Sequence, residues 1–287
     1  MQRKIIKQGK QGNTIFLPIK WIRSHHLKPG DAIEMSEVGN GLLISGKGNT
    51  LVKQEKYLSL VSENERFIRI QLQGLYRLGY DKITIENPSS PQKEIIEKII
   101  NSILLGFEIV SSNEKFLILE NVAEPSLEQA ETILQRMFFI IIESFSDNKI
   151  TSLEKVTKYD NFYRRTITKK HLSEETASFY WSLSTYLNLI ARNRIHFISF
   201  QENTFSPFLK QEIKLIEPFL KDMRKAFFAE DKLLIAEIQI DAEKHLNKHL
   251  LPLLKKGKEC AGLYFLAEYT RLINLATSPI LAILTNK

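Results

Sequence analysis

Six basic side chains lie within the first 23 residues of the chain, and their chemistry is that of phosphate binding. They are Arg3, Lys4, Lys7, Lys10, Lys20 and Arg23. Guanidinium and ammonium groups gathered on one surface can neutralise nucleic-acid phosphates and release the counterions condensed on them. We therefore interpret these residues as candidate contacts to double-stranded DNA. Their types do not separate contacts to phosphates from contacts to bases.

The distribution of charge along the chain points the same way. Residues 1–60 contain ten basic and four acidic side chains, a surplus of +6, whereas the whole chain carries +7. An asymmetry of this kind indicates a polyanionic partner for the N-terminal part. A basic face that only keeps the protein soluble is the alternative that charge alone leaves open.

Other chemistry finds little support in the sequence. The chain has no glycine-rich phosphate loop, nucleophile elbow or zinc-binding spacing, so we expect neither an enzyme nor a bound cofactor. His245 and His249 are four residues apart, as two metal ligands on a helix would be, but no third ligand is evident. The single cysteine, Cys260, excludes an intramolecular disulfide, and we expect it to be a buried small residue of the last helix.

Length and composition are those of an ordinary globular protein. The 287 residues are 43% hydrophobic and 25% charged, which is enough for two or more domains. Neither an apolar stretch long enough to span a bilayer nor a signal peptide is evident. We therefore expect a cytoplasmic protein without membrane insertion.

The candidate DNA contacts belong to a segment of short elements, residues 1–47. The expected elements are strands at 3–7 and 14–17, a helix at 19–26 that packs Ile19 and Ile22 inward, a turn at Pro29-Gly30, and a hairpin of strands 32–38 and 41–46. So few residues in short strands cannot hold a stable core. A second copy of the chain must therefore supply the missing half.

Residues 48–122 are expected to form a linker and a small α/β unit. The linker covers roughly 47–62. The α/β unit would comprise a helix at 63–78, a strand at 82–86, a helix at 91–105 and a hairpin of 107–112 with 115–120. Residues 68–72 also alternate like a strand, so the first helix is the least distinct element.

The remainder of the chain reads as helical. Apolar residues recur at three- and four-residue spacing in six segments, about 125–147, 151–170, 173–203, 206–229, 231–254 and 257–286. They divide into two sets of three, residues 123–204 and 205–287, which suggests an internal duplication. The expected fold class is thus mainly α with a small β domain.

The first segment resembles the swapped-hairpin domain of the AbrB, SpoVT and MazE family. The resemblance covers residues 2–46 and lies in the stretches TIFLP, IKWIR, LKPGD and the hairpin IEM…GLLIS. It implies an interleaved homodimer, formed through the N-terminal hairpins, that binds DNA. The alternative is a module that serves dimerisation alone.

The helical part resembles PhoU-like regulators, which are built from two three-helix bundles. The stretches that carry the resemblance are YLNLIARNRIHFISF (186–200) and YTRLINLATSPILAIL (269–284). Family members hold a metal cluster with an acidic pair on each of these helices. The corresponding residues here are Asn188, Arg192, Thr270 and Asn274, so we expect no metal. Acids remain on the neighbouring helices at Glu154, Asp160, Asp231 and Asp241, and we expect them to be solvated or salt-bridged.

Taken together, the chain looks like the archaeal group of AbrB–PhoU fusion proteins, often called phosphate uptake regulators. The stretches LYRLGYDKITIE (75–86) and LLGFEIV (104–110) add to this resemblance. It implies a dimeric DNA-binding transcriptional regulator of phosphate homeostasis. The alternative is a PhoU-type adaptor that acts on a phosphate transporter or a sensor kinase through protein contacts.

Overall fold

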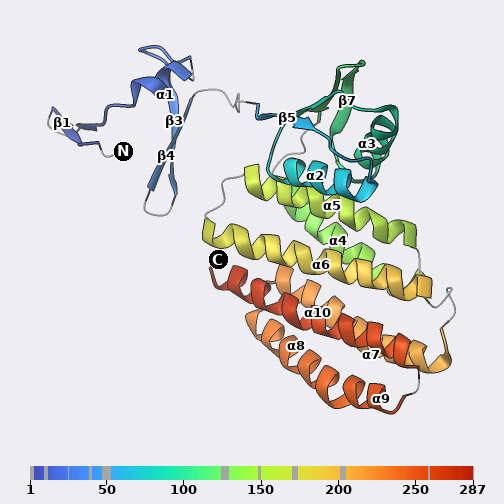
Figure 1. The fold of residues 1–287 in the computed structure, drawn as a ribbon. Coiled ribbons are helices and arrows are strands. Elements are labelled where there is room, and N and C mark those ends of the chain that lie inside the picture. Colours follow the sequence, from blue (N-terminus) through green and yellow to red (C-terminus); the bar gives the residue numbers. More distant parts are fainter. Residues whose placement is uncertain are drawn as a thin grey trace. The chain divides into compact units, whose positions relative to one another are not determined.

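Helices dominate a computed structural model of the chain, with the described strands in two short hairpins and one four-stranded sheet (Figure 1). The structure describes residues 3–9, 12–24, 26–38, 41–46, 53–123, 129–147, 150–169, 174–200, 205–257 and 259–286. The chain divides into two compact units, Met1–Val52 and Lys53–Lys287. The expected class, mainly α with a small β part, is confirmed.

The described residues of the smaller unit form two antiparallel hairpins and one short helix. Its elements are β1 (Ile6–Gln8), β2 (Gly12–Thr14), α1 (Ile19–Ser24), β3 (Ile33–Val38) and β4 (Gly41–Gly46). The second hairpin agrees with the prediction, and its strands pair from Ile33 with Gly46 to Val38 with Gly41. The turn between them, at residues 39–40, lies outside the described residues.

The larger unit begins with a sheet whose strand order is β5-β6-β8-β7. Its elements are β5 (Glu55–Ser59), α2 (Glu65–Arg77), β6 (Lys82–Glu86), α3 (Ser90–Ile103), β7 (Phe107–Ser112) and β8 (Phe116–Asn121). β5 runs parallel to β6, and the other neighbouring pairs are antiparallel. Alternate residues of β6 and β8, such as Ile83 and Leu119, pack with the buried faces of α2 and α3 into one core.

The ends of the two helices explain why they start where they do. Asn64 caps α2 by accepting a hydrogen bond from the N–H of Phe67, and Ser89 forms a capping box with Gln92 at the start of α3. Such caps satisfy backbone N–H groups that have no partner within the helix. The ambiguous segment at 68–72 is therefore helix, as the longer pattern indicated.

The expectation of a linker through residue 62 is wrong for β5. The sequence EKYLS is polar and mostly exposed, so it lacks the alternation that marks a half-buried strand. It forms a strand because its backbone pairs in parallel with one edge of β6, whose other edge pairs with β8. Tertiary pairing, rather than hydrophobic pattern, therefore determines this element.

The helical segments agree with the six that were predicted. They are α4 (Gln129–Asp147), α5 (Ile150–Lys169), α6 (Glu174–Phe200), α7 (Pro207–Phe228), a composite of α8 (Lys232–His245), the π-helical turn η1 (Leu246–Leu250) and α9 (Leu251–Lys255), and α10 (Cys260–Thr285). Ser206 caps α7 by accepting from the N–H of Leu209, with Pro207 in the first turn. This start agrees with the sequence signal.

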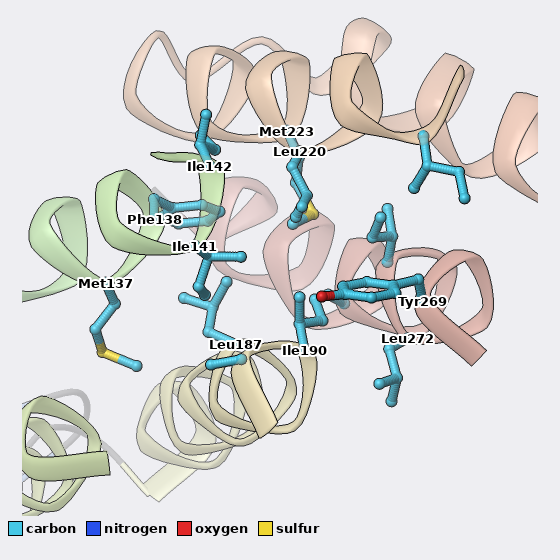
Figure 2. Packing of buried hydrophobic residues seen from close by; sticks show 14 of the residues in the cluster. Met137, Phe138, Ile141, Ile142, Leu187, Ile190, Leu220, Met223, Tyr269 and Leu272 are labelled. Carbon is cyan, nitrogen blue, oxygen red and sulfur yellow. The ribbon is translucent and has the colours of Figure 1, made fainter. Parts of the chain in front are cut away.

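Each set of three helices packs internally, and the two sets share one hydrophobic core. The contacts between the sets join equivalent members, α4 with α7 and α6 with α10. Figure 2 shows the junction, where Phe138 and Ile141 of α4, Leu187 and Ile190 of α6, Leu220 and Met223 of α7, and Tyr269 and Leu272 of α10 converge. Because equivalent helices meet, the arrangement is that expected of an internal duplication.

A buried polar face of α5 joins the helices to the sheet. The Arg165 guanidinium donates to Asp81 Oδ1 at 2.6 Å and to the Tyr80 carbonyl at 2.7 Å. Lys169 Nζ lies 2.5 Å from the same Asp81 oxygen, and Arg77 of α2 donates to Asp160 at 3.0 Å. The two carboxylates, those of Asp81 and Asp160, are buried, so loss of a cationic partner would leave a buried charge without compensation.

Candidate nucleic-acid interface

The basic residues belong to short elements whose backbone is held by the first hairpin and by the turn after α1. β1 pairs with β2 from Ile6 opposite Thr14 to Gln8 opposite Gly12. After α1, the Asp31 carboxylate accepts from the Lys28 N–H at 2.6 Å, and Gly30 has a φ of +99°. Left-handed backbone of this kind favours glycine, which explains the Lys-Pro-Gly-Asp sequence of the turn.

Two details of the expected N-terminal elements are corrected. The second strand was predicted at 14–17 but comprises Gly12–Thr14, because Thr14 is the last residue that faces a β1 partner. The helix was predicted at 19–26 but ends at Ser24, and His26 has a positive φ of 53°. Ile19, expected to pack inward, is 59% exposed, whereas Ile22 is half-buried.

The structure places five of the six predicted DNA contacts on the surface of the smaller unit. Arg3 and Lys4 precede β1, Lys7 lies in β1, and Lys20 and Arg23 lie in α1; all are exposed. Lys10 lies outside the described residues. Lys20 and Arg23 are three residues apart and share one side of α1. Within the described residues, none of the five forms a salt bridge, so their charges are directed to solvent.

The described residues of the smaller unit form almost no hydrophobic interior. Among its residues whose exposure the structure describes, none is buried. Its most exposed large apolar side chains are Ile5 (72%), Phe16 (71%), Met35 (61%), Ile19 (59%) and Leu42 (55%). A single chain thus leaves uncovered the apolar surface that stabilises a fold of this size.

The residues at the PhoU-like positions take part in hydrogen bonds of the helical core. Asn188 Nδ2 donates to Asp160 Oδ2 at 3.0 Å, and Asn274 Nδ2 donates to the Gln239 carbonyl at 3.0 Å. Thr270 is buried and donates to the carbonyl one turn earlier, whereas Arg192 is exposed. Asn188 therefore links α6 to α5, and Asn274 links α10 to α8.

Asp160 has the most hydrogen-bond partners, among the described residues, of the four acids on helices next to the PhoU-like positions. It is fully buried and accepts from Arg164 at 2.6 Å, Ser184 at 2.6 Å and Arg77 at 3.0 Å, in addition to Asn188. This confirms a salt-bridged role for Asp160. Elsewhere in the described residues, Asp231 caps α8, and Glu154 and Asp241 are exposed. No group of three His, Cys, Asp or Glu side chains in the described chain could hold a metal ion.

The histidine pair lies at the π-helical turn. The rings of His245 and His249 stack with their centroids 4.9 Å apart, and His249 Nε2 lies 2.7 Å from a carboxylate oxygen of the buried Glu212. Sequence reasoning missed Glu212 because it lies 37 residues earlier, on α7. The expectation for Cys260 is wrong, since this residue is exposed at the first position of α10.

No known protein family, no curated protein and no solved structure matches this chain. In the part of the chain that the structure describes, no helix combines the length and apolar character needed to cross a membrane.

Proposed function

We propose that this protein is a dimeric DNA-binding transcriptional regulator. In this proposal, residues 1–47 of two chains combine into a swapped-hairpin domain, and the basic side chains of both copies face the DNA. The observation that carries the proposal is that the smaller unit combines exposed, unbridged cations with an apolar surface that one chain leaves uncovered. Exposed cations alone could equally form a solubilising face, and uncovered apolar surface alone would indicate only dimerisation.

Pairing of two copies would account for both properties. Covering side chains such as Phe16 and Ile5 removes apolar surface from water, and each large side chain fully buried contributes about 1.5–3 kcal/mol. A two-fold dimer also doubles each cation and sets the copies symmetrically, which suits an operator of two-fold character.

The larger unit is proposed to be the input module, a small α/β unit followed by two PhoU-like bundles at 123–204 and 205–287. The paired contacts α4–α7 and α6–α10 support a duplicated arrangement. The resemblance to archaeal AbrB–PhoU proteins makes phosphate homeostasis the proposed process, in the cytoplasm. The roles of Asn188 and Asp160 in hydrogen bonding support a module that works without the metal cluster of that family.

A binding titration tests the DNA proposal. Fluorescence anisotropy would compare a duplex from upstream of the protein's own gene with a shuffled duplex of the same composition, across a salt series. The double variant Lys20→Gln/Arg23→Gln should bind more weakly. In a dimer it removes up to four phosphate contacts, so the slope of log K against log salt should fall by about 3 to 4.

The matched control is Lys210→Gln/Lys214→Gln, which removes two exposed cations from α7 of the larger unit. It should leave affinity and slope unchanged. Undetectable binding at low salt, or equal affinity for both duplexes, would show that the protein is not a sequence-specific regulator. The adaptor hypothesis, in which the hairpins only dimerise the chain, would then take its place.

A further inference from the structure

A cavity of about 400 Å³ lies in the larger unit where the start of α4, the end of α5, the start of α6 and the end of α7 meet. We call it the aromatic pocket. Four rings line it, those of Tyr163, Tyr180, Phe227 and Phe228. Its volume is within the range of sites that hold small organic ligands. Aliphatic side chains of α4 and α5 complete the wall.

The charged groups of the aromatic pocket are all of one sign among the described lining residues. They are Glu131, in the first turn of α4, and Glu230, just after α7. Both carboxylates are partly in solvent, and that of Glu131 can meet an incoming ligand at the surface. The described wall of this cavity thus combines aromatic rings with carboxylates, in a chain with a net charge of +7.

Tyr163 supplies a polar group inside the aromatic pocket. Its side chain is 96% removed from solvent, since its exposure is 4%, yet its hydroxyl makes no hydrogen bond with the described part of the chain. A buried hydroxyl usually has a partner. Burial raises the pKa of the Tyr163 phenol, and Tyr180 and Glu131 raise it further. The group therefore stays protonated and can both donate and accept a hydrogen bond.

From this arrangement we propose that the aromatic pocket binds a small organic cation, an alkylammonium group on an apolar body. The faces of aromatic rings attract a cation, and partial desolvation strengthens the attraction. Glu131 supplies the counter-charge, and the rings cover the apolar body. A hard metal ion fits less well, because such ions require six or more oxygen ligands. The inference concerns the larger unit alone and does not rest on the proposed DNA binding.

Three probes that differ in charge but share one apolar body test the proposal. They are phenethylammonium, phenethyl alcohol and hydrocinnamate, each titrated into the full-length protein by calorimetry and followed by ligand-observed NMR. The ammonium probe should bind at least tenfold more tightly than the neutral alcohol, a difference of about 1.4 kcal/mol, and the carboxylate should not bind measurably. Equal binding of the three, or no binding of the ammonium probe at millimolar concentration, overturns the proposal.

Variants place the probe in the aromatic pocket. Glu131→Gln/Glu230→Gln should weaken binding of phenethylammonium roughly tenfold or more, whereas Glu143→Gln, an exposed glutamate of the same helix α4, should not. Tyr163→Phe keeps the ring and removes the hydroxyl, so it provides a second test if the double variant folds poorly. Unfolding curves establish that each variant is folded. Ammonium binding that both the double variant and Tyr163→Phe leave unchanged would place the probe elsewhere and refute the assignment.

Discussion

Asp81 and Arg165 are 84 residues apart in the chain, yet Arg165 Nη2 donates to Asp81 Oδ1 at 2.6 Å and both side chains are buried. The pair joins the residue before β6 to the C-terminal part of α5. Lys169 shares the same carboxylate oxygen, so one acid serves two cations of the helix. The buried carboxylate of Asp81 is thus one of the links that hold α5 against the sheet unit, beside the pair of Arg77 and Asp160.

Asp81→Asn should destabilise the protein strongly. The substitution leaves Arg165 and Lys169 without the charge of this carboxylate, and breaking a buried ion pair costs about 3–5 kcal/mol. Urea unfolding of the full chain, followed by circular dichroism, measures the loss. Asp222→Asn, at an exposed position of α7, is the control and should change the unfolding free energy by no more than about 0.5 kcal/mol. Equal effects of the two variants would contradict this role for Asp81.

The contribution of Asp81 should disappear in acid. Burial alone would raise the pKa of its carboxyl, but hydrogen bonds from Lys169 and the Gln54 N–H, with the charges of Lys169 and Arg165, bring the pKa below its ordinary value of 3.8. The folded state therefore binds this proton less readily than the unfolded state. The stabilisation is complete above about pH 3.8 and is lost as pH falls through the folded-state pKa.

The measurement is the difference in unfolding free energy between the wild type and Asp81→Asn as a function of pH. It should be constant near neutral pH and shrink as the pH falls below the ordinary carboxyl value. A difference that stays constant throughout the acid range would mean that Asp81 acts through shape and not through charge.

Protonation of His245 should lower the free energy of unfolding in mildly acidic solution. Burial and then the charge of His249 lower the pKa of His245 below 6.5, against the opposing effect of Glu212. The unfolded chain therefore binds this proton more readily, so the stability that neutral His245 provides is present above about pH 6.5 and falls as pH drops through the folded-state pKa. The other charged groups at this site are Asp241, Lys244 and Lys248.

His245→Gln removes the titrating ring, so its unfolding free energy should vary less with pH below about 6.5 than that of the wild type. The comparison needs matched thermal or urea unfolding at several pH values. His196→Gln, at an exposed position of α6, should retain the wild-type dependence. If His245→Gln shows the same slope as the wild type, another group is responsible for the acid sensitivity.

Phe16→Ser should weaken the proposed dimer. A large aromatic side chain that becomes buried between two copies commonly contributes about 2 kcal/mol or more, so the dimer dissociation constant should rise roughly thirtyfold. Sedimentation velocity over a range of concentrations measures it. Val61→Ser removes an exposed apolar side chain (83%) from the larger unit and serves as the control. A wild-type chain that is monomeric at all concentrations would contradict the prediction and the proposed pairing.

The helices could be predicted from the sequence because apolar residues such as Leu134, Met137 and Ile141 recur at helical spacing and meet one core. β5 could not, because its polar residues acquire strand structure from the edge of β6. Arg165 and Asp160 look like surface residues by type, but both are buried, and the partners of each include a residue more than 80 positions away. The aromatic pocket had no signal at all, since its rings come from three helices with no common motif.

Gln54 lies two residues inside the larger unit, and both of its backbone polar groups are bound. Its N–H donates to Asp81 Oδ2 at 3.1 Å, and its carbonyl accepts from the N–H groups of Asp81 and Lys82. Hydrogen bonds therefore hold the backbone from Gln54 onward. The carboxylate that binds Gln54 is also the one that holds Arg165 and Lys169, so one side chain joins the first residues of the larger unit to α5.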